Sequence, residues 1–567
     1  MAMKSFNRRT LLGHSAAAAA ALALRSKFAW AQGAPIATTT SGRIRGLTEA
    51  GIHAFKSVPY AADTARTRFM APLPVAPWTG VKECVRFTKM APQLTAARAG
   101  AAGAGAVAAP ATSSSGVPGA PRDQGVQSED CLHLNVWTPG LRNGDGKKRP
   151  VLVYFHGGAY NNGTVNSDLY DGKRLCHRGD VVVLTVNHRL NAFGYLYLGD
   201  LASEYAESGN AGQLDLVLAL KWVKENIAEF GGDPARVLIF GQSGGGAKCA
   251  ALMATPVAKG LFHRVMTMSG QQIKGASIEI AAGRAKTVLA KMGIAGGVRG
   301  KELVAQVNAL TMEQIQEGAR AVSADWLPVV DHVVLPRNPF DPDAPSLSET
   351  VPMILGNVHD ETAVGGRGGA ITWDTAAAAL DAAVHEYLGP YTAAEVVAEF
   401  RRIHPDYTPE QVDVAAATAF RAWPGQRWEA ERRAADPISQ PRTWVYQMNF
   451  AGANGRAMHT VDIPFMFDNI GFAGGQVGTA PEQVSAANAL AAVMSQMLIT
   501  YARTGNPNGD SVGAMQGGAL PYWPAYDLKE RSTMIWERKP HVENDPRGAE
   551  RVFADKSHYH QAGTPLP

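Results

Sequence analysis

The chain has 567 residues, of which 46% are hydrophobic and 18% charged, as in an ordinary soluble globular protein. No run of 18 consecutive apolar residues occurs, so we expect no membrane-spanning segment. The formal net charge is +4, but residues 1–31 hold five basic residues and no acidic one. Without that segment the charge becomes −1, which gives no electrostatic reason to expect nucleic acid or anionic lipid as a partner.

The first 31 residues are predicted to be a twin-arginine signal peptide. Arg8 and Arg9 lie within the pattern Asn-Arg-Arg-Thr-Leu-Leu, an alanine- and leucine-rich run follows, and residues 29–31 form an Ala-x-Ala cleavage site. We therefore expect a mature protein that begins at Gln32 and is periplasmic or secreted after twin-arginine export. Residues 32–567 are expected to form a single domain.

The mature chain alternates between strand and helix patterns. An N-terminal hairpin is predicted over residues 37–55, and an aromatic-free insert of low complexity, residues 94–127, is predicted to be a surface loop. Buried strands are predicted at 131–137, 150–155, 180–187, 237–240, 262–268 and 351–358, and an amphipathic helix at 214–230. This order predicts an α/β protein with a mostly parallel sheet and helices on both faces, covered by helical segments at 275–330 and 370–440.

The clearest chemical motif is Gly-x-Ser-x-Gly at residues 241–245. It follows the apolar run 237–240 and precedes a helical pattern, the strand–turn–helix setting in which this motif presents a nucleophilic serine. The turn forces Ser243 into a strained backbone conformation, and glycine flanks it because larger residues would collide. Ser243 is therefore the candidate nucleophile.

A second glycine motif, His-Gly-Gly-Ala at residues 156–159, follows the strand predicted at 150–155. Small residues let the backbone approach a reacting carbonyl closely, so its N–H groups can stabilise an oxyanion. We predict an oxyanion hole made by the N–H groups of Gly158, Ala159 and Gly244.

An acid and a base must complete the site, because a serine hydroxyl is a weak nucleophile at neutral pH. Asp360 and Glu361 both follow the strand predicted at 351–358, and the residues alone do not choose between them. Six histidines come later in the chain, and His459 is the preferred base because an apolar, aromatic stretch follows it. The other five are His385, His404, His541, His558 and His560.

Together these motifs resemble the type-B carboxylesterase family, which includes bacterial para-nitrobenzyl esterases and animal cholinesterases. The resemblance spans about residues 38–551 and includes Glu-Asp-Cys-Leu-His-Leu-Asn-Val at 129–136 and Asn-His-Arg-Leu at 187–190. It implies an α/β-hydrolase fold and a triad of Ser243, Glu361 and His459, with Glu361 chosen over Asp360. It also implies that Ser269 supports the acid and that no metal or cofactor is needed.

The sequence departs from the family pattern at several places. Gln242 stands where glutamate usually precedes the nucleophile, and the insert lacks the cation-binding tryptophan of cholinesterases, so choline esters are not expected as substrates. The family's cysteine partner for Cys131 would fall near Ala91, so that disulfide is either absent or re-paired with Cys84.

The predicted function is a serine carboxylesterase that hydrolyses small esters through an acyl-enzyme on Ser243. Two alternatives remain: hydrolysis of an amide, carbamate or polyester, and a non-catalytic binding relative. Trp326, Phe465 and Phe467 are predicted to line the pocket, and no motif identifies the natural ester or the oligomeric state.

Overall fold

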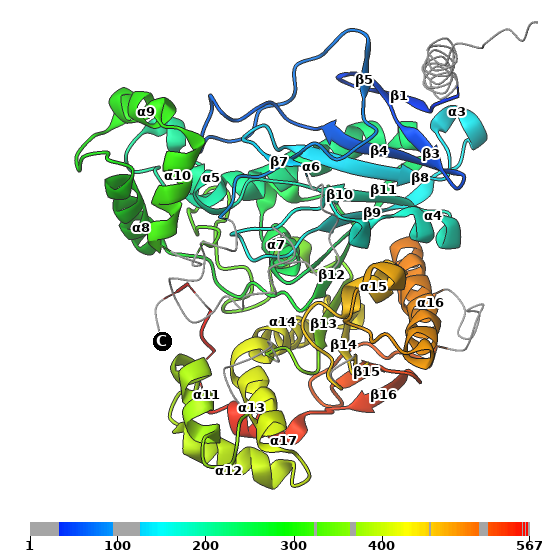
Figure 1. Cartoon of the computed structure of the whole chain (residues 1–567), viewed down its shortest axis with the longest axis vertical. Helices are drawn as coiled ribbons and strands as arrows, with labels where there is room; N and C mark the ends of the chain where they lie inside the picture. Colours follow the sequence, from blue (N-terminus) through cyan, green and yellow to red (C-terminus); the bar gives the residue numbers. More distant parts are fainter. Residues whose placement is uncertain are drawn as a thin grey trace, which may run out of the picture.

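Eleven strands form one continuous sheet in the computed structural model (Figure 1). The structure describes residues 33–94, 125–322, 326–362, 370–452, 455–509, 520–557, 559–561 and 563–564. Within these residues the strands follow the spatial order β16-β15-β14-β13-β12-β11-β9-β10-β8-β4-β3. Their bounds are β3 Leu47–Glu49, β4 Ile52–Pro59, β8 His133–Thr138, β9 Arg149–Phe155, β10 Val182–Val186, β11 Gly232–Gln242, β12 Arg264–Met268, β13 Met353–Val358, β14 Thr443–Met448, β15 Ser532–Trp536 and β16 His541–Asn544.

The centre of the sheet is parallel, as predicted. Every neighbouring pair from β10 to β15 in this order is parallel, whereas β8, β4 and β3 at one edge and β16 at the other pair antiparallel. In the register of β9 with β11, Phe155 lies beside Gly241. The loops that follow β9, β11, β13 and β14 therefore lie together at the carboxyl ends of the parallel strands, where ligands bind in folds of this kind.

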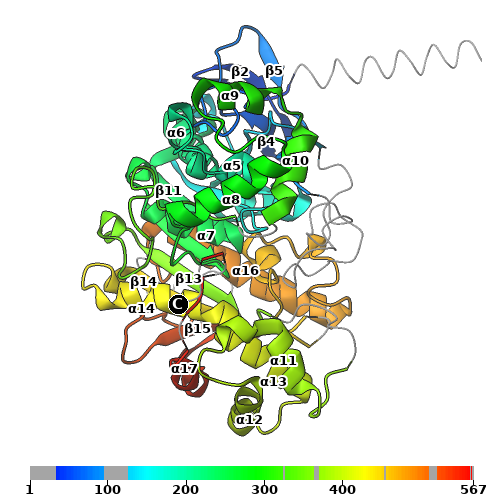
Figure 2. The same ribbon diagram turned by 90° about the vertical axis from the view of Figure 1, so that its left-hand side faces the viewer.

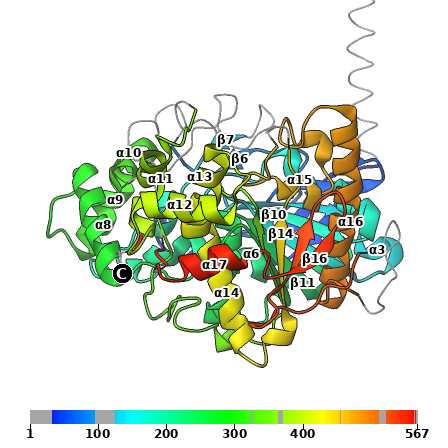
Figure 3. The same cartoon turned by 90° about the horizontal axis from the view of Figure 1, so that it is seen from below.

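Both faces of the sheet are buried, which explains the continuous apolar runs. Alternate residues of β9 enter two separate cores: Val151, Val153 and Phe155 pack on one face, and Leu152 and Tyr154 on the other. The first core includes residues of α6 (Ala211–Asn226), α7 (Gly244–Met253) and α14 (Trp423–Ala435). The second includes residues of α4 (Lys173–Gly179), α15 (Asp462–Met466) and α16 (Pro481–Thr504). Figure 3 shows α15 and α16 beside the sheet.

Two groups of helices lie beyond the sheet and match the predicted covering segments. The first group is α8 (Ile278–Lys291), α9 (Gly300–Ala309) and α10 (Met312–Ala319). The second is α11 (Ala376–Val384), α12 (Ala393–Ile403) and α13 (Pro409–Ala417), with α17 (Gly548–Ala554) packed against α12. Figure 2 shows the two groups at opposite ends of the molecule. Three of these helices begin with a threonine capping box, at Thr311, Thr392 and Thr408.

The remaining elements are short. The predicted N-terminal hairpin is present as β1 paired with β2, followed by β3 paired with β4. Other short elements are β1 Ile36–Thr39, β2 Gly42–Arg45, β5 Val81–Glu83, β6 Lys89–Met90, β7 Val126–Gln127, α3 Arg142–Asp145 and α5 Asn191–Tyr195. The predicted signal peptide and residues 95–124 of the predicted insert lie outside the described residues.

Helix α16 is long and apolar enough to cross a membrane by length and composition alone. Half of its most apolar window is buried, and the helix contacts β9, β11, α4 and α15, as the core helix of a soluble protein would. A single helix of this kind is weak evidence for a membrane span, and the expected absence of one stays a prediction.

The four cysteines, Cys84, Cys131, Cys176 and Cys249, are all free and buried. The alternative in which Cys131 is re-paired with Cys84 is therefore wrong. Each thiol is enclosed by core side chains, and burial raises the pKa of Cys84 to about 12.

Candidate active site

Ser243 lies at the junction between β11 and α7, with the positive φ that so tight a turn requires. Its φ is +56° and its ψ is −127°. The Ser243 N–H donates to the carbonyl of Met268 over 2.7 Å, and the Ser243 carbonyl accepts from the N–H of Ala247 over 3.1 Å. A Cβ at Gly245 would collide with the carbonyl of Phe155, which explains glycine at that position. Ser243 itself is partly exposed, so solvent reaches this turn.

His459 and Glu361 come together from two loops at the carboxyl ends of the parallel strands. Nδ1 of His459 lies 2.5 Å from Oε2 of Glu361. The Glu361 side chain is 3% exposed and that of His459 is 35% exposed. The other carboxylate oxygen, Oε1, accepts from the N–H of Val358 over 2.9 Å and from the Asn357 amide over 3.3 Å. The carboxylate is thus fixed from behind while the imidazole remains accessible.

The loops that carry the acid and the base are hydrogen-bonded to each other. The Asp360 N–H donates to the Ala457 carbonyl over 3.0 Å, and the Ala457 N–H donates to Oδ2 of Asp360 over 2.8 Å. The Asp360 side chain is therefore turned toward Ala457 and His359, whereas Glu361 faces His459. Of the two carboxylates left open by the residues, Glu361 is the one that contacts the histidine.

The charges of this pair reinforce each other. Burial alone would raise the pKa of Glu361, but the charge and hydrogen bond of His459, the nearby Ser269 hydroxyl and the Val358 N–H hold it below its ordinary value. Burial opposes protonation of His459, yet the negative charge of Glu361 outweighs it and raises the pKa of the imidazole. The acid therefore stays ionised at neutral pH, and the pKa of the base lies above its ordinary value.

Gln242 reaches the second nitrogen of the imidazole. Its Nε2 lies 3.3 Å from Nε2 of His459, and the residue is 1% exposed. With the Nδ1 proton directed at Glu361, Nε2 of neutral His459 accepts a hydrogen bond from the amide. Among the described contacts this bond is made by Gln242 and not by the Ser243 hydroxyl. The lone pair on Nε2 is thus directed at the side chain of Gln242, the residue before Ser243.

The loop after β9 presents backbone N–H groups beside this turn. Gly158 and Ala159 both have positive φ, +87° and +49°. A Cβ at Gly244 would collide with the backbone of Ala159, so the loop and the N-terminus of α7 are in contact. Among the described residues, the N–H groups of Gly158, Ala159 and Gly244 donate to no protein acceptor. These donors and the N-terminus of α7 can stabilise a negative charge at one point.

Ser269 directly follows β12 and lies behind the turn. Its φ is +50°, it is 8% exposed, and its N–H donates to the carbonyl of Gly356 over 2.7 Å. Its hydroxyl forms no hydrogen bond of ordinary geometry, although it lies close enough to help lower the pKa of Glu361. A Cβ on the next residue, Gly270, would collide with the carbonyl of Ser243, so β12 supports the turn from below.

Known proteins resemble this chain over most of their length. Residues 33–382 match the family described as the Carboxylesterase family. The chain is 32% identical over 531 residues to the para-nitrobenzyl esterase of Bacillus subtilis, covering 91% of this chain and 97% of that protein. The chain belongs to the carboxylesterase family.

Solved structures support the same conclusion for this carboxylesterase. A carboxylesterase of Geobacillus stearothermophilus superimposes with a TM-score of 0.74 and 31% identity, covering 91% of this chain and 99% of that chain. An esterase from the anaerobe Clostridium hathewayi is described as able to hydrolyse aliphatic aromatic polyesters. It superimposes with a TM-score of 0.72 and 29% identity, covering 93% of this chain and 99% of that chain. The predicted α/β-hydrolase fold, the family and the class of carboxylic-ester hydrolase are thereby confirmed.

The other candidate histidines of the carboxylesterase lie in structural or surface contacts. His385 is exposed and bonded to Asp381, and His404 is bonded to Glu550 beside α17. His541 is bonded to Glu543 on the exposed β16. His560 lies near Glu386, and His558 lies outside the described residues. None of the described ones is in contact with Glu361.

The predicted pocket-lining residues are core residues. Trp326 is 3% exposed, and Phe465 and Phe467 are fully buried. Phe467 packs against Tyr154 and Phe240 under the sheet. Within the described part of the chain, no group of three His, Cys, Asp or Glu residues is arranged to hold a metal ion.

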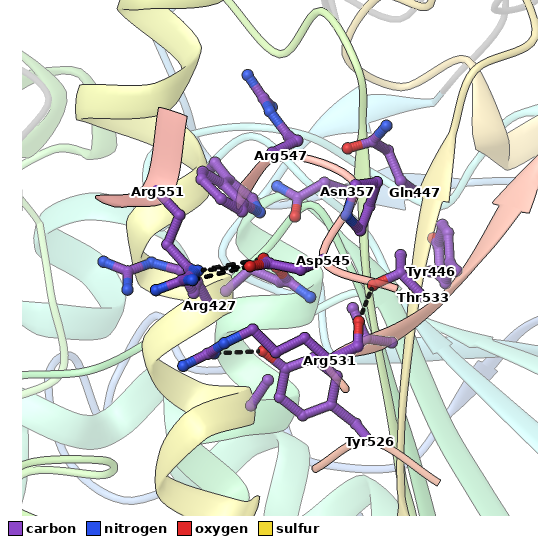
Figure 4. Close-up of a pocket in the computed structure, with 15 residues that line it drawn as sticks. Asn357, Arg427, Tyr446, Gln447, Tyr526, Arg531, Thr533, Asp545, Arg547 and Arg551 are labelled. Carbon is purple, nitrogen blue, oxygen red and sulfur yellow. Dashed lines mark hydrogen bonds and ion pairs between the residues drawn. The ribbon is translucent and has the colours of Figure 1, made fainter. Parts of the chain in front are cut away.

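A small cavity of about 30 Å³ is lined by residues of β13, β14 and α14, among others (Figure 4). Asn357, which bonds Glu361, forms one wall, and the opposite side carries arginines in ion pairs. The arginines are Arg427, Arg531, Arg547 and Arg551. Neither Ser243, His459 nor the loop after β9 lines this cavity, so it is separate from the place where an ester would react.

Sequence analysis missed two residues that shape the site. Asn357 is an ordinary polar residue within an apolar strand, and only its bond to Glu361 reveals its place. Lys248 gave a stronger signal: it is a charged residue in the otherwise small and apolar helix α7.

Proposed function

We propose that this protein is a serine carboxylesterase that works through an acyl-enzyme on Ser243. The observation that carries the proposal is the 2.5 Å contact between His459 Nδ1 and Glu361 Oε2, with the second imidazole nitrogen turned toward the Ser243 turn. The three groups lie at one edge of one sheet, and the hydroxyl-bearing turn is open to solvent. This is the arrangement by which an imidazole activates a serine.

The proposed reaction uses only side chains, backbone donors and water. The Ser243 hydroxyl displaces the Gln242 amide from Nε2 of His459, and its oxygen attacks the ester carbonyl as His459 takes the proton. The N–H groups of Gly158, Ala159 and Gly244 stabilise the resulting oxyanion. His459 then returns the proton to the departing alcohol, and Glu361 stabilises the transient imidazolium. Water repeats the sequence to release the acid and restore Ser243.

Hydrolysis of a short para-nitrophenyl ester tests the assignment. Ser243→Ala and His459→Gln should reduce turnover by a factor of about 10⁴ or more while the melting temperature stays near that of the wild type. His385→Gln is the matched control, because that histidine is exposed and remote, and it should hydrolyse the ester at the wild-type rate. Full activity in Ser243→Ala would refute the acyl-enzyme.

A fluorophosphonate probe separates the enzyme from a non-catalytic binding relative. It should label the wild type at Ser243 in a one-to-one ratio and should not label Ser243→Ala. Absence of labelling in the folded wild type would favour the non-catalytic reading.

The similarity to an esterase described as acting on aliphatic aromatic polyesters favours a second substrate class within the same chemistry. The partly exposed Ser243 and the exposed Ala159 are compatible with attack on a long polymer chain. Release of soluble acids from a polyester film, compared with turnover of small esters, amides and carbamates, would identify the preferred bond.

We also propose that the protein is exported through the twin-arginine route, as the Arg8-Arg9 pattern and the Ala-x-Ala site predict. Replacing both arginines with lysine should leave the protein in the cytoplasmic fraction of its host, with its ester hydrolysis unchanged. Export of the double-lysine variant at the normal level would contradict this proposal.

A further inference from the structure

Lys248 is fully buried on α7, five residues after Ser243. Among the described residues no carboxylate forms an ion pair with it, although burial of an unpaired ammonium is unfavourable. Burial lowers the pKa of Lys248 to about 7. A charge-bearing side chain kept under these conditions needs a reason other than stability.

The contacts of Lys248 indicate that reason. Its Nζ donates to the carbonyl of Ala159 over 2.7 Å and to the carbonyl of His156 over 3.2 Å. It also lies 5.4 Å from the centre of the Tyr160 ring. The two carbonyls bracket the loop His156–Ala159, whose N–H groups are the proposed oxyanion donors. One amine therefore ties together both ends of that loop.

The loop needs such a constraint because its backbone is strained. Ala159 has a φ of +49°, a conformation that side-chain-bearing residues rarely adopt. The carbonyl bound by Lys248 belongs to the peptide that joins Ala159 to Tyr160, so the bond fixes the C-terminal end of the segment that carries the N–H groups of Gly158 and Ala159. Beyond it, the Tyr160 hydroxyl donates to Gln272 over 2.8 Å and fixes the end of the loop.

The other groups that face Lys248 are neutral. His156 and His188 stack at 4.7 Å, and burial together with the Lys248 charge lowers the pKa of both, that of His156 to about 3. The Cys249 thiol and the Tyr160 hydroxyl have raised pKa values, mainly because they are buried. The buried carboxyl of Glu429 interacts with Cys249 and Tyr160, and burial raises its pKa to about 8, so at neutral pH it too is mostly uncharged and does not compete with the two carbonyls for the amine.

We propose that Lys248 is a positioning residue that holds the loop His156–Ala159 in the shape that presents the oxyanion donors. This inference rests on the proposed esterase function and names what keeps its oxyanion hole in place. Lys248 itself does not touch the substrate.

The test compares Lys248→Met with Cys249→Ala. Methionine keeps the volume and removes the donors, so kcat for a para-nitrophenyl ester should fall at least tenfold while KM changes less than about threefold. The affinity for a trifluoromethyl ketone, which forms an oxyanion on the serine, should fall by the same factor as kcat/KM. Because an unpaired buried amine is removed, the melting temperature should stay the same or rise. Cys249→Ala, at the next buried position of α7, should lower the melting temperature and keep kcat.

Hydrogen exchange gives a readout that does not depend on catalysis. The amides of Asn161 and Asn162, which donate to the Gly158 carbonyl over 3.1 and 3.2 Å, should exchange faster in Lys248→Met than in the wild type and Cys249→Ala. Lys248→Gln can reach at most one of the two carbonyls and should show a smaller change of the same kind, and it replaces Lys248→Met if that variant does not fold.

Unchanged kcat in Lys248→Met, or unchanged exchange of this loop, would overturn the proposal. If instead the wild type neither hydrolyses esters nor reacts with a fluorophosphonate, the proposed function fails, and the exchange experiment still decides whether Lys248 holds the loop.

Discussion

At the scale of single residues, the site depends on which of two adjacent carboxylates meets the imidazole. Their side chains diverge, so that Asp360 bonds the Ala457 N–H and Glu361 bonds His459. Only the positions of two loops that lie about a hundred residues apart in the chain decide this, and local sequence holds no information on it. The serine and the histidine were recognisable from their neighbours, but the acid was not.

Substitution of each carboxylate in turn should distinguish the role of Glu361 from that of Asp360. Glu361→Gln should lower kcat about 100-fold or more and shift the acidic limb of the pH–rate profile to lower pH. The shift has this sign because the charge that raises the pKa of His459 is removed, and the base must be neutral to act. Asp360→Asn keeps that charge, so its limb should stay in place and kcat should fall by less than about tenfold. Stopped-flow hydrolysis between pH 5 and pH 9, by roughly unit steps, measures the acidic limb of each variant. Equal changes of kcat and of the acidic limb in the two variants would contradict the assignment.

The amide of Gln242 is the hydrogen-bond partner of His459 Nε2, and Gln242→Glu should change the pKa of that imidazole. A carboxylate near Nε2 favours the imidazolium, so the pKa of His459 should rise and the acidic limb should move to higher pH by about one unit. Activity near pH 6 should therefore fall, while activity above pH 8 should change less. Esters with a cationic group should gain in kcat/KM relative to neutral ones.

Gln242→Met is the control for that experiment, because it removes the amide without adding charge. The acidic limb of the pH–rate profile of Gln242→Met should not move to higher pH. A limb at the wild-type pH in Gln242→Glu would show that residue 242 has no electrostatic influence on the base.

At the scale of secondary structure elements, the junction of β11, Ser243 and α7 was predictable because all its signals are local. The apolar run, the flanking glycines and the helix lie within about twenty residues of one another. Strand β14, which leads to His459, was missed. Its polar residues are satisfied by bonds that sequence does not reveal, Tyr446 to Asp462 and Gln447 to Asn449, so the strand lacks a continuous apolar run. The prediction that Trp326, Phe465 and Phe467 line the pocket was wrong for a related reason, because aromatic residues occur equally in cores and in pockets.

Two helix glycines should respond in opposite ways to alanine. In Gly245→Ala on α7 the new Cβ would meet the carbonyl of Phe155, so we expect a destabilisation of about 2 kcal/mol or more and a loss of activity. In Gly283→Ala on α8 the Cβ meets no atom within 4 Å, so the free energy of unfolding should rise by about 0.5–1 kcal/mol. Thermal unfolding and ester hydrolysis measure both effects, and a neutral Gly245→Ala would contradict the tight packing of the turn.

At the scale of the whole molecule, the structure depends on packing and not on disulfides. The four thiols are free and buried, so a thiol reagent should modify none of them in the native protein and four after denaturation. A reducing agent should leave the melting temperature unchanged. Fewer than four reactive thiols in the unfolded, unreduced protein would show that a disulfide forms in solution.

Helix α16 makes the order of folding and translocation important. The buried residues of this 24-residue helix, Pro481–Thr504, are covered by β9, β11 and α15. Threaded through a translocon as an extended polypeptide, the same stretch could lodge in the bilayer and arrest transit. Completion of the tertiary structure in the cytoplasm removes that hazard, and cargo of this kind is suited to a machinery that carries proteins across already folded.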